Sequence, residues 1–163
     1  MLLDRGRADI QFVIIGEGQL KKELIERAKK ECLSNVMFLD LMPKSALVGY
    51  VQHALASVIP LKPIPVFDTS SPNKLFESMA AGVPVIQTTQ GWIKDFLSEH
   101  GVGFTVDGNS PHQLADVLIR LKDDPALKNE TGKKAAATSK EFFNKDYLAD
   151  KMLTILKKVH AGN

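Results

Sequence analysis

The chain is poor in cysteine: Cys32 is the single residue of this type among 163. One cysteine cannot form a disulfide within the chain, so small secreted domains held together by disulfides are excluded. Cys32 lies in the stretch ERAKKECL, a pattern that predicts the inner face of an amphipathic helix and not a reactive thiol. We therefore expect a protein of a reducing compartment, the cytoplasm.

Long apolar runs and an excess of one charge are also missing. No run approaches the ~18 residues of a membrane-spanning helix, and the opening MLLDRGRAD lacks the apolar region of a signal peptide. Lys and Arg total 21 against 19 Asp and Glu, and the two signs are interspersed. Since no basic tract is present, the sequence predicts no nucleic-acid groove. Since no long apolar run is present, it predicts no transmembrane segment.

Clustered metal ligands are absent as well. The histidines are scattered along the chain without ligand spacing and without a neighbouring cysteine: His53, His100, His112 and His160. A structural or catalytic metal needs several such ligands close together. We expect neither a metal ion nor a cofactor.

What the sequence does contain is an alternation of short β-rich runs and helical patterns. The runs are continuous and not alternating, which is typical of strands covered on both faces, and they span 10–15, 36–39, 56–60, 84–87 and 103–106. Helical patterns separate them, near 19–32, 43–54, 72–81 and 91–100. This order predicts an α/β fold, a Rossmann-like parallel sheet with helices on both faces.

The rest of the chain reads as helix. Patterns at 110–122, 125–140 and 145–160 have no strand between them, so we expect a helical C-terminal tail. Three helix starts are marked by a capping residue followed by proline: Ser71, Ser110 and Asp124. Without a linker or repeat, residues 1–163 are expected to form a single domain.

The loop from Leu61 to Ser71 draws attention to the helix that follows it. Loops at the carboxyl ends of parallel strands are where open α/β sheets bind ligands. On that helix Lys74, Glu77 and Ser78 fall on the side opposite the apolar residues. The free amides of the helix start and Lys74 suit a phosphate, and Glu77 suits sugar hydroxyls. Spacing alone nevertheless favours a solvated Lys–Glu pair on a surface helix.

Four segments, in this order, resemble the carboxyl-terminal half of family 4 retaining glycosyltransferases of the GT-B fold: FVIIGEGQLKKELIERAK, NVMFLDLMPKSALVGYVQHALASVIPL, SSPNKLFESMAAGVPVIQT and GVGFTVDGNSPHQLADVLIRLKDDP. The resemblance covers nearly the whole chain. Its most specific part, NKLFESMAAGVPVI, is similar to the branch that makes bacterial surface polysaccharides.

The resemblance implies a set of substrate-binding residues. Glu77 matches the second glutamate of the family's paired-glutamate motif, which binds the nucleotide ribose. The amides of Asn73 and Lys74 match those that hold the diphosphate, and Lys74 is the candidate charge stabiliser. The remaining candidates are the glycine turn, the stretch that meets the base and the loop before the helix: Gly16, Gly18, Leu41, Met42, Thr69 and Ser71.

Two departures from the family pattern stand out. The first glutamate of the motif is replaced by Thr69, with Asp68 beside it out of register. The family's first strand, and the loop after it with an arginine and a lysine, have no counterpart; Arg5 and Arg7 precede the first predicted strand and do not match them. The missing strand would lie near the middle of the sheet, so we expect a gap, rearranged edges or a strand borrowed from a neighbouring copy.

The activity implied by the resemblance is transfer of a sugar from a UDP-sugar donor to an acceptor, in polysaccharide or lipopolysaccharide biosynthesis. The acceptor would be held by an N-terminal domain or partner subunit, and the full enzyme would be cytoplasmic and peripheral at the membrane. This half would bind the donor nucleotide weakly and would have no transferase activity alone, because the closed cleft needs both domains.

Two other readings stay open. GEGQLK after a strand, with Asp40 ending the next, imitates the fingerprint of an NAD(P)-binding oxidoreductase domain, although Lys21 stands in place of the third glycine. A non-catalytic nucleotide-binding module, or one subunit of a split transferase, would also fit. Trp92 is either a platform for the donor sugar or a packing residue, and we favour packing.

Overall fold

The computed structural model describes residues 1–161, and all of its strands pair in parallel. The strands are β1 (Phe12–Ile15), β2 (Val36–Leu39), β3 (Ser57–Ile59), β4 (Val85–Gln87) and β5 (Gly103–Thr105). β1 pairs with β2, and β4 pairs with β3 on one side and β5 on the other. Each strand lies within one of the runs expected from the sequence, which confirms the parallel α/β prediction.

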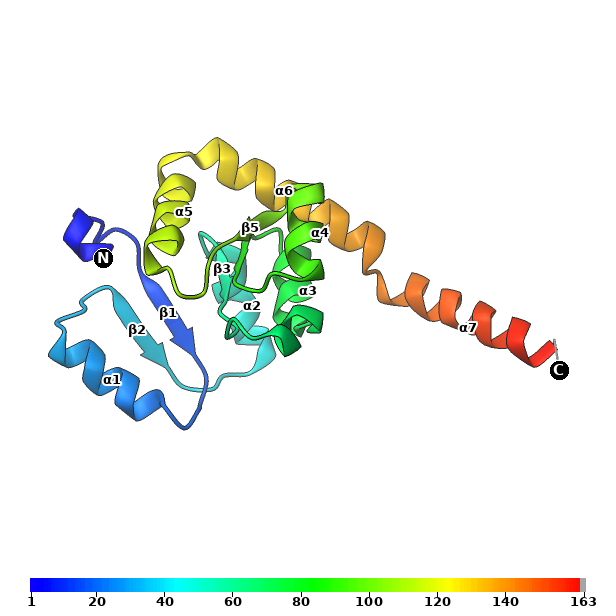
Figure 1. Ribbon diagram of the computed structural model, residues 1–163, viewed down its shortest axis with the longest axis horizontal. Helices are drawn as coiled ribbons and strands as arrows, with labels where there is room; N and C mark the ends of the chain where they lie inside the picture. Colours follow the sequence, from blue (N-terminus) through cyan, green and yellow to red (C-terminus); the bar gives the residue numbers. More distant parts are fainter. Residues whose placement is uncertain (162–163) are drawn as a thin grey trace.

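The strands form two sheets, β1–β2 and β3–β4–β5, and no ladder joins them within residues 1–161. Between the start of β1 and the residues before β3 lies a cavity of about 250 Å³, lined by Ile10 and Gln11 on one side and by Ala54 and Leu55 on the other. Val13 and Ile14 of β1 remain 42% and 44% exposed. Of the three arrangements left open by the family resemblance, the structure shows the gap, which falls between β1 and β3 (Figure 1).

Helices cover both faces of the three-stranded sheet. One apolar cluster joins this sheet to α3 (Asn73–Ala80), α4 (Trp92–His100) and α6 (Pro125–Phe142). A second cluster joins its other face to α5 (Pro111–Asp123) and to Ile10, just before β1. Because neighbouring side chains of a strand point to opposite faces, Val85 belongs to the first cluster and Ile86 to the second.

The remaining helices lie around this core. α1 (Lys21–Lys30) follows β1, and α2 (Lys44–His53) follows β2, while two short 3₁₀ helices span Leu3–Arg5 (η1) and Pro65–Thr69 (η2). No residue of α1 or α2 is fully buried. Figure 1 shows α1 beside the β1–β2 pair, on the side away from the other helices.

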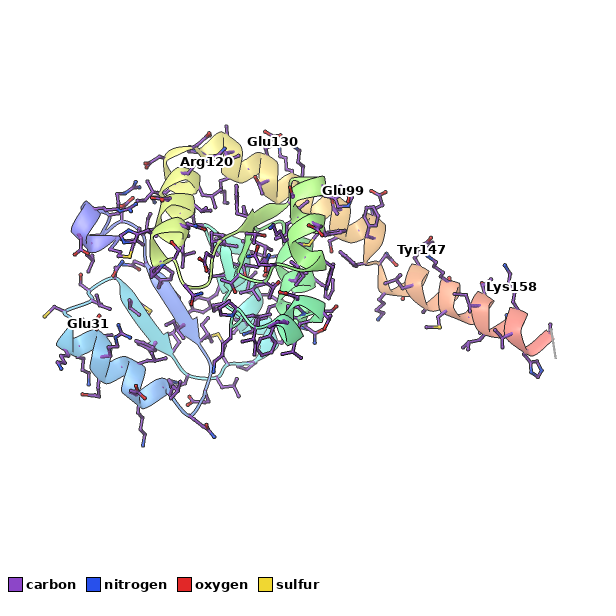
Figure 2. All side chains as sticks on the ribbon, in the orientation of Figure 1. Glu31, Glu99, Arg120, Glu130, Tyr147 and Lys158 are labelled. Atoms are coloured by element: carbon purple, nitrogen blue, oxygen red, sulfur yellow. The ribbon has the colours of Figure 1, made fainter. Side chains whose placement is uncertain are left out.

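α7 (Lys145–Ala161) forms the predicted helical tail and projects away from the body (Figure 1). None of its residues is buried. Its apolar side chains are exposed: Tyr147, Leu148, Met152, Leu153, Ile155, Leu156 and Val159. Figure 2 shows Tyr147 and Lys158 extending from α7 with no other element beside them.

Two local predictions are wrong. Cys32 is exposed and lies beyond the end of α1, with a left-handed backbone (φ 52°) that ends the helix, so it occupies no inner face. Ser71 caps no helix, because α3 begins at Asn73 with Pro72 as its cap residue. Ser110 and Asp124 do cap their helices, accepting hydrogen bonds from the amides of Gln113 (3.4 Å) and Leu127 (2.9 Å).

No helix within the described residues 1–161 is both long and apolar enough to cross a membrane.

Candidate functional site

The candidate residues occupy the loops and helix starts that follow β1, β2 and β3. Gly16 comes directly after β1, and its amide donates to the carbonyl of Leu39 at the end of β2 (3.2 Å). Its φ of 132° is a conformation that only glycine adopts without strain. Gly18, in contrast, has an ordinary backbone and open space around its α-carbon. The glycine turn is thus required at Gly16.

An ion-pair cluster occupies the turn between β1 and α1. The ammonium of Lys21 lies 2.7 Å from carboxylate oxygens of both Glu17 and Asp40. The hydrogen bond from Lys21 lowers the pKa of Asp40, and the bonds to Asp40 and Glu17 raise the pKa of Lys21. In a dinucleotide-binding site Asp40 would bind a ribose. Here Lys21, which replaces the third glycine of that fingerprint, forms an ion pair with the Asp40 carboxylate.

The stretch after β2 presents Leu41 and Met42 at the surface. Leu41 is 77% exposed, an unusual setting for a large apolar side chain, whereas Met42 is half-buried. Both residues precede α2, whose cap residue Pro43 provides no capping side chain. The Leu41 side chain therefore lies on an open surface, shortly before the start of α2.

The loop after β3 is anchored to the loop after β4. The Asp68 carboxylate accepts a hydrogen bond from the amide of Gln90 (2.9 Å), and a β-carbon at Gly91 would lie only 2.1 Å from the Asp68 carbonyl oxygen. The Thr69 hydroxyl donates to the carbonyl of Val66 within η2 (3.1 Å). Asp68 thus fixes the loop, and neither residue presents a free carboxylate where the family has its first glutamate.

The first turn of α3 carries no capping side chain in the described structure. Ser71, Asn73 and Lys74 are all exposed around it. A helix start leaves its first amides without partners in the helix and concentrates partial positive charge there. The ammonium group of Lys74 adds a full charge beside these amides, so the start of α3 is suited to an anion.

The two faces of α3 differ in part from the prediction. Leu75 and Met79 are fully buried, as expected, but Ala80 is exposed. Ser78, expected on the open side, is buried, and its hydroxyl donates to the Ser57 hydroxyl at the start of β3 (2.7 Å). A small hydroxyl can face the sheet because a second hydroxyl satisfies it. The open side of α3 is thus left to Lys74 and Glu77.

Glu77 has a partner that the sequence analysis missed. The ammonium of Lys44, the first residue of α2, lies 2.6 Å from Glu77 Oε1. This ion pair brings the start of α2, beyond the β1–β2 sheet, next to α3, which follows β3. The signal in the sequence was the position of Lys44, two residues after Met42, at which the stretch assigned to the base ends.

Trp92 is a packing residue, as favoured. Its indole N–H donates to the carbonyl of Ser70 (2.9 Å), and its ring lies 6.4 Å from that of Phe76 and 6.0 Å from that of Phe96. The Trp92 side chain therefore holds the loop before α3 through the Ser70 carbonyl. The Phe76 ring is stacked on the indole at an interplanar angle of 18°, so packing occupies a face that a sugar platform would need.

Basic residues near the N-terminus serve the fold. Arg5 pairs with Asp116 of α5, and Arg7 pairs with Asp9 (2.9 Å) and with Asp123 at the end of α5 (2.8 Å). Hydrogen bonds to Asp9 and Asp123 raise the pKa of Arg7. These pairs tie the segment before β1 to α5. No group of three or more potential metal-binding side chains occurs in the part of the chain that the structure describes.

Comparisons with known proteins agree with this architecture. The family model described as "Glycosyl transferases group 1" matches residues 1–138. The D-inositol 3-phosphate glycosyltransferase of Streptomyces avermitilis is 35% identical over 136 residues, which are 82% of this chain and 28% of that protein. The chain spans less than half the length of the curated relatives it matches.

Solved structures confirm the fold. Sucrose-phosphate synthase from Thermosynechococcus elongatus aligns with a TM-score of 0.80 at 22% identity, over 99% of this chain and 42% of that one. Anabaena HepE, solved in complex with UDP, aligns with a TM-score of 0.77 at 18% identity, over 96% of this chain and 44% of that one. The Rossmann-like fold class predicted from the sequence is therefore correct.

Proposed function

Because the chain belongs to the family of group 1 glycosyl transferases, we propose that it is the donor-binding half of a retaining glycosyltransferase that uses a UDP-sugar. The single observation that carries the proposal is the uncapped start of α3, with Lys74 beside it and the Glu77 carboxylate one turn further along. An anion and a sugar hydroxyl pair are adjacent parts of a nucleotide diphosphate. We propose that the helix start and Lys74 bind the first of these parts and that Glu77 binds the second.

The proposed roles follow from the chemistry of each group. The amides of Asn73 and Lys74 and the ammonium of Lys74 hold the diphosphate and stabilise the charge that builds on it as the sugar leaves. The Glu77 carboxylate accepts hydrogen bonds from the ribose hydroxyls. Backbone groups at Leu41 and Met42 meet the base. The turn at Gly16 and Gly18, together with Thr69 and Ser71, completes the border of the nucleotide.

The identity of the nucleotide rests on the structural relatives. HepE was solved in complex with UDP and, in a further structure, with UDP-glucose. Within the family we propose the family 4 branch that builds bacterial surface polysaccharide or lipopolysaccharide, as the NKLFESMAAGVPVI segment suggests. An enzyme of this branch would act in the cytoplasm and peripherally at the membrane.

Transfer itself requires more than these residues. The chain spans less than half of its curated relatives, so we propose that an N-terminal acceptor-binding domain or partner subunit completes the cleft. Among the described residues Lys74 can act as the charge stabiliser. The arginine and lysine that the family carries in the loop after its own first strand have no counterpart among these residues. We therefore expect UDP binding without transferase activity from this chain alone.

The first prediction tests the ribose contact. Glu77→Ala removes the acceptor of two ribose hydrogen bonds and is expected to weaken UDP binding by about tenfold, measured by calorimetry. Glu99→Ala is the matched control, since Glu99 is an exposed glutamate near the C-terminal end of α4 (Figure 2). An unchanged affinity in Glu77→Ala contradicts the assigned role. A titration with NAD is expected to show no heat of binding.

A further inference from the structure

The ion pair between Lys44 and Glu77 lies at the proposed ribose site. The Lys44 ammonium is 2.6 Å from Glu77 Oε1, and the two side chains are 76% and 45% exposed. Lys44 is the first residue of α2, and only Pro43 separates it from the stretch proposed to meet the base. It therefore lies between the sites proposed for the base and for the ribose, although the family resemblance gives it no role.

A ribose bound through both oxygens of Glu77 would compete with this pair for Oε1. The ribose hydroxyls need the Glu77 oxygens as acceptors, and Lys44 already donates to one of them. An exposed ion pair contributes only about 0–1 kcal/mol. Its exchange for two hydroxyl hydrogen bonds is therefore inexpensive, and it releases the ammonium of Lys44 into the site.

The released ammonium has an obvious new counterion. A nucleotide places its phosphates on the same ribose, and a lysine side chain is a flexible four-carbon stem carrying a point charge. Glu77 alone would repel a diphosphate bound on the same side of α3. With Lys44 and Lys74 both present, the three side chains together carry one net positive charge, which favours the anion.

We propose that Lys44 is a nucleotide-binding cation that is held by Glu77 in the free protein and moves to a phosphate of the nucleotide when the ribose takes Glu77. This inference rests on the proposed function and adds a residue to its site. Lys44 thereby adds to the affinity a contribution that depends on the phosphates of the ligand.

The experiment compares UDP with uridine on the intact chain. Binding is followed by NMR titration for wild type, Lys44→Ala and Lys44→Arg, at fixed ionic strength. Lys44→Ala is expected to weaken UDP binding by about two- to fivefold, the range of one exposed charge contact. Uridine binding is expected to stay unchanged or tighten, and Lys44→Arg is expected to retain the wild-type affinity for UDP.

A matched control separates this role from a general loss of charge. Lys134→Ala also removes one exposed lysine from an ion pair, with Glu130 of α6 at 2.7 Å, and is expected to leave UDP binding unchanged. An equal loss for UDP and uridine in Lys44→Ala would mean that Lys44 only orients Glu77, and it overturns the proposal. Unchanged or tighter UDP binding overturns it as well. If wild-type protein does not bind UDP, the proposed function itself fails.

Discussion

At the scale of single residues, Lys21 carries the tightest cluster of charges near the site. Its side chain is only 15% exposed, and its ammonium lies 2.7 Å from both Glu17 and Asp40. It also donates to the carbonyl of Leu39 at the end of β2 (3.3 Å). A cation that contacts the turn after β1 and the end of β2 holds the two strand ends in register.

This cluster predicts a measurable pH effect. The bond from Lys21 lowers the pKa of Asp40 below 3.8, so its stabilising contribution is present above pH 3.8 and is lost as the pH falls through the folded-state pKa. A carboxyl NMR titration is expected to place the midpoint of Asp40 below 3.8. Lys21→Met is expected to raise that midpoint, whereas Lys22→Met, an exposed neighbour, is not. Equal midpoints in wild type and Lys21→Met would refute the prediction.

The sequence predicted some site residues better than others. Lys74 was placed on the open side of α3 by helix periodicity, because position in a helix follows from spacing alone. Ser78 was misplaced, since periodicity cannot show that the Ser57 hydroxyl on the sheet accepts its hydrogen bond. Lys44 was missed because its partner, Glu77, is 33 residues away. Contacts between distant segments depend on tertiary packing and leave no local pattern.

At the scale of elements, the packing of α6 against α3 depends on a glycine, a residue without a side chain. A β-carbon at Gly132 of α6 would lie 2.2 Å from the carbonyl oxygen of Gly82, which follows α3. Gly82 itself has φ 72° and ends the turn before β4. The close backbone approach lets α6 cover the core residues Leu75 and Met79. Glycine at position 132 is thus a packing requirement and not a helix weakness.

Two glycine-to-alanine substitutions test this interpretation. Gly132→Ala forces the two backbones apart and is expected to lower the free energy of unfolding by about 1–3 kcal/mol. Gly49→Ala, in α2, meets open space and is expected to raise it by up to about 1 kcal/mol, because alanine is the better helix former. Thermal and urea unfolding measure both. Effects of the same sign in the two variants would be inconsistent with the close approach.

The order of elements was predicted almost completely, and the reason is that each carries its own signal. Continuous apolar runs mark the strands, and Ser110 and Asp124 mark helix starts through side chains that do cap. The start of α3 was placed one residue too early, since Ser71 before a proline has the same appearance as these caps. The pairing of strands into two sheets was not predicted and came from the structure, because pairing is not local.

At the scale of the whole molecule, the β1–β2 pair is loosely attached. It contacts the remainder mainly through the segment before β1, where Ile10 joins the core of α5 and Arg7 pairs with Asp123. The edge of β1 that faces β3 is unpaired in the described structure. An unpaired apolar edge favours association with another strand, so we retain the proposal that copies of this chain associate there.

Hydrogen exchange is expected to reveal this difference in attachment. Val85 and Ile86 of β4 are fully buried, whereas Val13 and Ile14 of β1 are over two-fifths exposed. Amides of β1 and β2 should therefore exchange through a local opening of lower free energy than amides of β4, which should exchange only on global unfolding. NMR exchange in low denaturant distinguishes the two classes. One common opening free energy for both sheets would show that they unfold together.

The projecting α7 makes the molecule a compact head with a rod attached. Seventeen residues of helix extend about 26 Å, so rotational diffusion of the whole is anisotropic. Amide N–H vectors of a helix lie nearly parallel to its axis, so rotation about the long axis of the rod hardly reorients them. Nuclear relaxation rates of α7 would differ from those of the head even if every joint in the chain were rigid.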